Sequence, residues 1–129
     1  MASIVVPCYN AERYLRRTLE SALAQTMEDF ELICVDNNST DKTPELLEEC
    51  APADSRVRVL SESEPGEGPA RDAGLKRARG RWAYFLDSDD LMEPTLLEKS
   101  ISLAEDSQAD IVVFQTNGLN DQTGEVAPI

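Results

Sequence analysis

The feature that most constrains the fold is a regular alternation of short apolar segments with amphipathic ones. Five apolar segments predict buried strands: residues 3–7, 30–35, 57–60, 82–86 and 111–114. The segments between them carry apolar residues at helical spacing and predict helices: residues 11–25, 43–49, 70–79 and 94–105. Strand and helix repeated in this way predict an α/β protein, a three-layer Rossmann-like sandwich with a mostly parallel sheet of about five strands.

Boundary signals support the predicted helices. Asn10 is a suitable N-cap for the first. Thr43 followed by Pro44 is a strong start signal for the second, because proline is favoured at the first helical position. Residues 116–129 have no clear period and indicate an irregular tail or the beginning of a further hairpin.

The charge of the chain excludes several functions. The 129 residues fit one domain and include 25 acids, 12 bases and no histidine, for a net charge of −13. Such a charge repels phosphate backbones, so we expect no nucleic-acid partner. Histidine-dependent catalytic triads and histidine-ligated zinc are excluded. A phosphorylated ligand would need a local basic patch or a metal ion. The three cysteines lack metal-site spacing and are expected to be reduced, since free cysteines are often buried.

Polar segments follow three of the predicted strands. Residues 8–10 follow the first strand, residues 36–41 the second and residues 87–90 the fourth. Ligands of open α/β sheets bind beyond the carboxyl ends of the strands, so these segments are expected to share one functional edge. Arg71, at the start of a predicted helix, is expected on the same side.

The acidic segment at residues 87–90 has two interpretations. Three carboxylates within four residues repel one another unless solvent or a cation compensates. Hard divalent ions such as Mg²⁺ or Mn²⁺ bind carboxylate oxygens and often take only one or two from the protein. The alternative is an acidic turn that complements the dipole of the helix beginning near Pro94.

Three other residues at this edge are candidates for binding a ligand, and two of them carry two interpretations each. Tyr9 is either a platform for stacking a nucleobase or an aromatic packed over the first helix. Asp36 either accepts hydrogen bonds from a base or ribose or closes an Asx turn. Arg71 is interpreted as an arginine held against a nucleotide.

Four motifs, taken together, resemble the family 2 glycosyltransferases, which have the GT-A nucleotide-sugar-binding fold. The resemblance covers roughly residues 3–115, and the four motifs have the order and spacing of the family. They are SIVVPCYN at residues 3–10, ICVDNNSTD at 33–41, GPARDAGL at 68–75 and FLDSDD at 85–90.

The resemblance implies a nucleoside-diphosphate sugar donor, commonly UDP-linked, and a divalent metal, Mg²⁺ or Mn²⁺. It implies that Tyr9 stacks on the base and that Asp89 coordinates the metal, with Asp87 near both ribose and metal. The donor-binding residues that it implies are Pro7, Tyr9, Asn10, Glu12, Asp36, Arg71, Asp87 and Ser88. Glu12 has a structural role as an equal alternative.

The implied reaction is inverting transfer, of the hexosyltransferase type, to an acceptor hydroxyl. A general base deprotonates the acceptor while the metal offsets charge on the leaving diphosphate. The family's base and acceptor-binding residues lie in the second half of its domain, and no residue of this chain is a candidate for the base. We therefore expect residues 1–115 to be the donor-binding half, residues 116–129 to be a tail or the start of the acceptor half, and the chain alone to be inactive.

Departures from the family pattern affect the expected site. Asn37 and Asn38 replace the usual second acid and glycine, which would alter contacts with the base. Asp72 replaces the usual asparagine after Arg71 and adds charge near the donor.

Two other classes of α/β protein fit the sequence less well. The sequence lacks the acids that a phosphoacceptor receiver domain requires after its strands. It also lacks the phosphate loop that a nucleotidyltransferase requires. A non-catalytic nucleotide-binding or scaffold module derived from the same fold remains as the alternative.

The resemblance also implies partners and a location. The acceptor would be a glycan or a lipid-linked glycan in polysaccharide biosynthesis. The enzyme would be cytoplasmic, with peripheral association at the inner face of the membrane. Exposed sheet edges would favour a homodimer.

Overall fold

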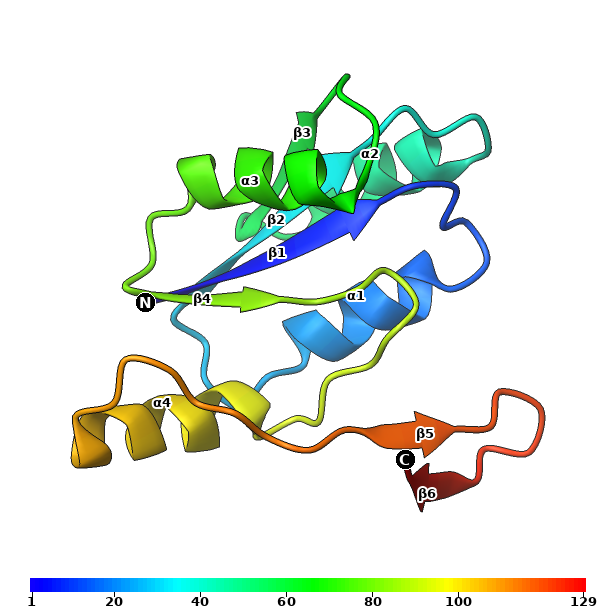
Figure 1. Ribbon diagram of the computed structural model, residues 1–129. Helices are drawn as coiled ribbons and strands as arrows, with labels where there is room; N and C mark the ends of the chain where they lie inside the picture. Colours follow the sequence, from blue (N-terminus) through cyan, green and yellow to red (C-terminus); the bar gives the residue numbers. More distant parts are fainter. The chain divides into compact units, whose positions relative to one another are not determined.

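The computed structural model describes residues 1–129, which form two compact units, Met1–Lys99 and Ser100–Ile129. The strands are β1 (Ala2–Cys8), β2 (Phe30–Asp36), β3 (Val57–Ser61), β4 (Trp82–Phe85), β5 (Asn117–Leu119) and β6 (Val126–Pro128) (Figure 1). The helices are α1 (Leu15–Leu23), α2 (Thr43–Ala53), α3 (Glu67–Arg77) and α4 (Leu96–Ser107). No helix combines the length and the apolar character needed to cross a lipid bilayer.

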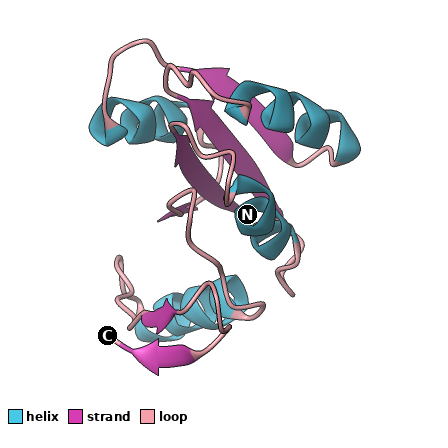
Figure 2. Cartoon of the chain, turned by 90° about the vertical axis from the view of Figure 1, so that its right-hand side faces the viewer, coloured by secondary structure: helices cyan, strands magenta, loops and turns pink.

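The first unit contains a four-stranded parallel sheet in the order β3-β2-β1-β4. The predicted α/β class and the parallel sheet are confirmed. The chain steps from β1 to β2 to β3 and then returns to the other side of β1. Because parallel crossovers are right-handed, this reversal places α3 on the face opposite to α1 and α2. Figure 2 shows helices on both sides of the sheet, as a three-layer sandwich requires.

Both faces of the sheet are buried, which explains why its central strands are continuously apolar. Alternate residues of a strand point to opposite faces. Val5, Ile33 and Val35 point to one face and form a fully buried cluster with Ala70 of α3. The intervening residues point to the other face, where Leu15, Leu19 and Leu47 from α1 and α2 are also buried: Ile4, Val6, Leu32 and Cys34.

Gly74 allows α3 to lie unusually close to the sheet. A Cβ atom built on Gly74 would stand 2.3 Å from Val5 Cγ1 and 3.3 Å from Val35 Cγ2. The first of these contacts leaves no room for a methyl group, and the second is tight. Glycine at this position therefore sets the distance between α3 and the sheet, and with it the position of the N-terminal end of α3.

A buried carboxylate organises the opposite end of the sheet. Glu31 is 6% exposed and accepts hydrogen bonds from Ser3 Oγ at 2.7 Å, Arg58 Nη1 at 2.8 Å and the Arg79 N–H at 2.6 Å. Ser3 Oγ also accepts a hydrogen bond from the Gly80 N–H at 2.8 Å. The network fixes the turn that leads from α3 into β4, and the acidic segment follows β4.

The expected fifth strand at residues 111–114 is not formed. The segment has no regular structure, and Ile111 and Val113 are 80% and 88% exposed. A strand needs a neighbour for its backbone as well as β-favouring side chains, and neither β5 nor β6 pairs with this segment. The predicted further hairpin does occur, because β5 and β6 pair antiparallel within Asn117–Pro128.

Several predicted helix ends are also corrected. Asn10 does not cap α1, which begins at Leu15 after Tyr14. The backbone of Asn10 has φ of 46°, and its side-chain oxygen accepts a hydrogen bond from the Thr40 N–H instead. Helix α2 continues past the predicted end to Ala53, and α3 begins three residues earlier than predicted, at Glu67.

Candidate functional site

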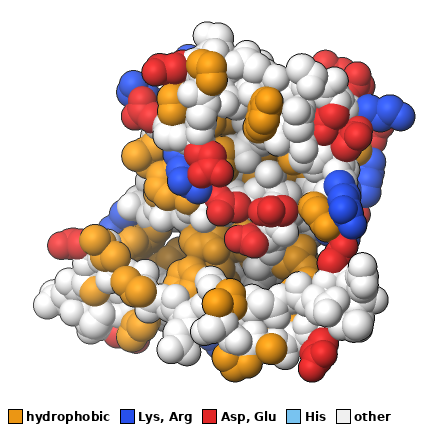
Figure 3. All heavy atoms as spheres, turned by 45° about the vertical axis from the view of Figure 1, so that its right-hand side comes forward, with side chains coloured by type: hydrophobic (Ala, Val, Ile, Leu, Met, Phe, Trp, Pro, Cys, Tyr) orange, Lys and Arg blue, Asp and Glu red, His pale blue; other side chains and the backbone are white.

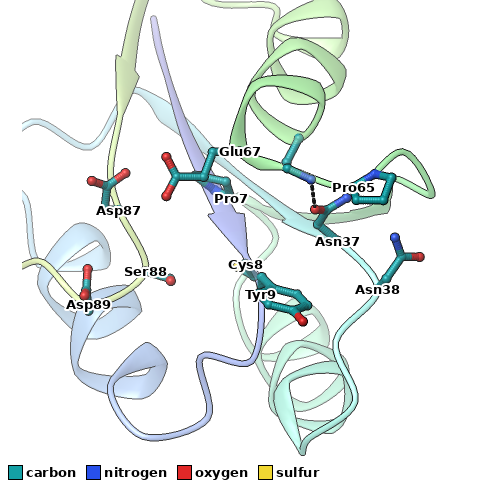
Figure 4. A pocket seen from close by; sticks show the side chains of 12 residues that line it. Pro7, Cys8, Tyr9, Asn37, Asn38, Pro65, Glu67, Asp87, Ser88 and Asp89 are labelled. Atoms are coloured by element: carbon teal, nitrogen blue, oxygen red, sulfur yellow. Dashed lines mark hydrogen bonds between the residues drawn. The ribbon is translucent and has the colours of Figure 1, made fainter.

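A pocket of about 720 Å³ opens at the carboxyl ends of β1 and β2, beside the segment that follows β4 (Figure 4). It lies entirely within the first unit. The lining residues come from the loops that follow the strands and from the start of α3: Pro7, Cys8, Tyr9, Asn37, Asn38, Pro65, Gly66, Glu67, Ala70, Asp87, Ser88 and Asp89. The predicted location of the site at this edge of the sheet agrees with the pocket.

Five of the predicted site residues line the pocket, and four do not. Those that line it are Pro7, Tyr9, Asp87, Ser88 and Asp89. Those outside its lining are Asn10, Glu12, Asp36 and Arg71.

The pocket has an aromatic side and an acidic side. The Tyr9 side chain projects from the end of β1 and is 63% exposed. Figure 4 shows its ring on one side of the pocket, with Asp87 and Asp89 on the other. An exposed ring at a pocket wall provides a flat surface for stacking, and the opposite side offers carboxylate oxygens.

Asn10 and Glu12 connect the loop after β1 to the loop after β2. Asn10 Oδ1 accepts a hydrogen bond from the Thr40 N–H at 2.7 Å, and Glu12 Oε2 accepts one from the Lys42 N–H at 3.1 Å. The structure thus gives both side chains a role in holding two loops together. This matches the structural alternative considered for Glu12.

Asp36 carries an unsatisfied buried oxygen at the end of β2. Its Oδ1 is buried without a hydrogen-bond partner. Cys8 is paired with Asp36 in the sheet register. Burial, and then the nearby Asp36 carboxylate, raises the pKa of the Cys8 thiol to about 12, although a backbone hydrogen bond at Val35 opposes the shift. Cys8 is therefore a neutral thiol at physiological pH and not a thiolate nucleophile.

Arg71 lies between two carboxylates beside the pocket. Its Nη2 is 2.8 Å from Asp87 Oδ1 and 3.3 Å from Glu67 Oε2, while its Nε is buried without a partner. Arg71 thus lies at the same sheet edge as the polar segments, as expected, and contacts the acidic one. One guanidinium group serves both acids and leaves the local charge negative.

The segment after β4 holds more negative charge than its neighbours neutralise. Burial, and then the charges of Asp89 and Asp87, raise the pKa of Asp90. Figure 3 shows a group of acidic side chains on one face of the molecule. Thr18 of α1 holds this segment, because its hydroxyl donates a hydrogen bond to the Ser88 carbonyl at 2.9 Å. No three acidic or cysteine side chains are arranged to hold a metal ion by themselves.

One wall of the pocket was not predicted from the sequence. Pro65, Gly66 and Glu67 lie between β3 and α3, and Asn37 of the β2 loop lies against them. A proline–glycine pair is a turn signal, and this pair stands in the loop after the third strand of the same parallel sheet. Combined with the sheet order, that signal would have placed this loop at the same edge.

Comparisons with known proteins find a matching family and a matching fold. The model of the family described as "Glycosyl transferase family 2" matches residues 3–128. Putative glycosyltransferase EpsH of Bacillus subtilis is 37% identical over 123 residues, which are 95% of this chain and 36% of that protein.

Several solved structures have the same fold. The crystal structure of Staphylococcus aureus TarS 1–349 in complex with UDP superposes with a TM-score of 0.85 at 29% identity, over 93% of this chain and 36% of the other. Glucosyl-3-phosphoglycerate synthase from Mycobacterium tuberculosis, in complex with Mn²⁺, UDP and glucosyl-3-phosphoglycerate, superposes with a TM-score of 0.59 at 29% identity, over 81% of this chain and 39% of the other. The chain spans less than half the length of the relatives that it matches.

Proposed function

The chain belongs to glycosyl transferase family 2, and on that premise we propose that its pocket binds the nucleoside diphosphate of a UDP-sugar donor. The observation that carries the proposal is the pairing of an exposed aromatic wall, Tyr9, with an opposite acidic wall, Asp87 and Asp89, in one pocket of about 720 Å³. This volume suits a nucleotide-sized ligand. The UDP in the similar TarS structure supports the choice of base.

The base and ribose would occupy the Tyr9 side of the pocket. Stacking on an exposed ring stabilises a nucleobase because both partners have a π-face. The backbone near Pro7 would contact the edge of the base. Asp36 has a buried oxygen that lacks a hydrogen-bond donor, and an N–H of the base or a ribose hydroxyl would satisfy it.

The acidic wall fits a divalent cation, Mg²⁺ or Mn²⁺. Asp87 and Asp89 line the pocket, and their charges add to the effect of burial in raising the pKa of the neighbouring Asp90. Because such ions commonly take one or two carboxylates and complete their shell with water and phosphate, two aspartates suffice. When bound, the metal would offset charge on the departing diphosphate. The Mn²⁺ and UDP in the similar glucosyl-3-phosphoglycerate synthase structure support this assignment.

The reaction we propose is inverting transfer of a hexose to an acceptor hydroxyl. Arg71 would keep Asp87 oriented through their 2.8 Å ion pair and would lend positive charge near the phosphates. Asp87 and Asp89 would face the leaving group and are poor candidates for the base that deprotonates the acceptor. The neutral Cys8 thiol is also unsuited to that role.

In our proposal, this chain is the donor-binding half of a longer enzyme. Residues 1–115 would form this half, and residues 116–129 would begin the part that binds the acceptor. The chain spans about a third of several relatives, which leaves room in them for a base and an acceptor site. We infer that this chain alone binds donor without transferring sugar. The full enzyme would act in polysaccharide synthesis at the inner face of the membrane.

Calorimetric titration of the 129-residue chain with uridine and with UDP, each with and without Mn²⁺, tests the proposal. Uridine has no phosphate, so its affinity should not respond to Mn²⁺, whereas UDP should bind more tightly when Mn²⁺ is present. A folded chain that binds neither ligand would contradict the proposal and leave the non-catalytic scaffold as the better account.

A further inference from the structure

A single side chain tethers the unpredicted wall of the pocket. Asn37 is 5% exposed, and its amide makes three hydrogen bonds to one loop. Its Nδ2 donates to the carbonyls of Glu62 at 2.8 Å and Glu64 at 2.7 Å, and its Oδ1 accepts from the Gly66 N–H at 2.9 Å. We refer to residues 62–66 as the β3–α3 loop. Every hydrogen-bonding position of the Asn37 amide except one acceptor lone pair is therefore used by this loop.

The β3–α3 loop has little else to hold it in place. Residues 63–66 are exposed, and the loop has no regular structure. Asn38 adds one bond, from Nδ2 to the Ser63 carbonyl at 2.9 Å, and the Glu62 N–H donates to the Asp36 carbonyl at 2.9 Å. One bond is internal, from the Glu64 N–H to Glu62 Oε1 at 2.8 Å. Since no side chain of residues 63–66 is buried, the position of the loop against the sheet depends on hydrogen bonds from the end of β2.

The residue type at position 37 matters because of the direction of these bonds. Two of them require a donor, and one requires an acceptor. Aspartate offers acceptors only and would place a carboxylate against two carbonyl oxygens. Glutamine is longer by one methylene and would not fit the same three positions without moving the loop. Asparagine is thus the side chain that the observed loop demands.

We propose that Asn37 is a positioning residue that presets the nucleoside side of the donor pocket through the β3–α3 loop. This rests on the proposed donor function of the pocket. Pro65 and Gly66 of the loop line the pocket together with Tyr9. Since the Asn37 amide is occupied by the loop, Asn37 acts on the nucleoside by fixing this wall and not by reading the base with its own side chain.

The main test is the Asn37→Asp variant, studied by calorimetry with uridine. Losing two donors should loosen the loop and raise the dissociation constant for uridine by roughly tenfold. The Mn²⁺-dependent enhancement of UDP binding should stay unchanged, because the acidic wall lies on the opposite side of the pocket. A general loss of structure would reduce both the affinity for uridine and the Mn²⁺-dependent enhancement of UDP binding.

Two further variants separate the loop from the added charge. Asn38 also lines the pocket, and Asn38→Asp adds the same charge there but removes only one bond to the loop. Aspartate tolerates the φ of 60° at this position, so Asn38→Asp should weaken uridine binding clearly less than Asn37→Asp does. Gly66→Ala leaves Asn37 in place but strains a residue with φ of 118°, and it should weaken uridine binding as Asn37→Asp does. Gly66→Ala also tests the loop if Asn37→Asp does not fold.

Hydrogen exchange of the Gly66 N–H reports on the tether without any ligand. We expect faster exchange in Asn37→Asp than in the wild type. Unchanged exchange, or uridine binding that is equal or tighter in Asn37→Asp, would overturn the proposal. So would Gly66→Ala with wild-type uridine affinity. If the wild type binds neither uridine nor UDP, the donor function fails, and the exchange result still decides whether Asn37 orders the loop.

Discussion

Replacing Glu31 with glutamine should destabilise the chain by about 2–4 kcal/mol. The carboxylate accepts three hydrogen bonds, at 2.7, 2.6 and 2.8 Å, and is 6% exposed. Hydrogen bonds to charged groups contribute about 1.5–3 kcal/mol each, and a buried partner left unpaired costs a similar amount. Glutamine keeps one acceptor oxygen but turns an NH₂ group toward donors, so at least one bond is lost and Arg58 loses its counter-charge.

The stability should be measured by urea unfolding at pH 7, with Glu48→Gln as the matched control. Glu48 is an exposed acid on α2, and its substitution should change stability by less than about 0.5 kcal/mol. For a chain of this size the Glu31→Gln loss corresponds to a drop in melting temperature on the order of 10 °C. Equal stability of the two variants would refute the role given to the buried carboxylate.

The pH dependence offers a second check on Glu31. Burial raises the pKa of this carboxyl, but the hydrogen bonds from Ser3, Arg79 and Arg58 outweigh it, and the net pKa is lowered. Its contribution to stability is therefore complete above the ordinary glutamate pKa of about 4.3 and is lost as the pH falls through the lower folded value. The stability difference between wild type and Glu31→Gln should narrow below about pH 4, and a constant difference would contradict this assignment.

Two further substitutions test the packing and the pocket. Gly74→Ala should destabilise the chain by about 1–3 kcal/mol, measured by thermal unfolding, because the new methyl group would stand 2.3 Å from Val5 Cγ1 and force α3 away from the sheet; a variant as stable as the wild type would show that α3 moves freely. Tyr9→Ala should leave the melting temperature unchanged, because the ring is 63% exposed, yet weaken uridine binding by roughly tenfold in calorimetry. Unaltered uridine affinity would remove Tyr9 from the nucleoside side of the pocket.

Local patterns predicted most of the first unit because its strands are buried on both faces. The apolar segment of β1, for example, needs no partner information to be recognised, and Pro44 after Thr43 marks the start of α2 within a residue. The segment at residues 111–114 has the same β-branched character but lacks a neighbouring strand, and strand propensity does not report on neighbours. Asparagine is a residue type favoured at helix N-caps, yet the Asn10 side chain accepts a hydrogen bond from the Thr40 N–H in a loop 30 residues away.

The candidate site also contains residues that could be predicted from the sequence and residues that could not. Tyr9, Asp87 and Asp89 follow strands directly, so the rule that ligands lie beyond the carboxyl ends of parallel strands places them at one edge. Asn37 and the β3–α3 loop could not be assigned together from the sequence. Their link is a set of hydrogen bonds across 25 to 29 residues, and only the packed structure shows which backbone groups meet the amide.

The central claim is that the pocket holds a nucleoside diphosphate against a cation bound by the acidic wall, and the Asp89→Ala variant tests it most directly. The measurement is the ratio of UDP affinities with and without Mn²⁺, in the wild type, Asp89→Ala and the neighbouring control Asp90→Asn. Asp90 does not line the pocket, so its variant should keep a ratio within about threefold of the wild type. We predict a ratio near one for Asp89→Ala with uridine binding intact. A ratio in Asp89→Ala equal to that of the wild type would contradict the account.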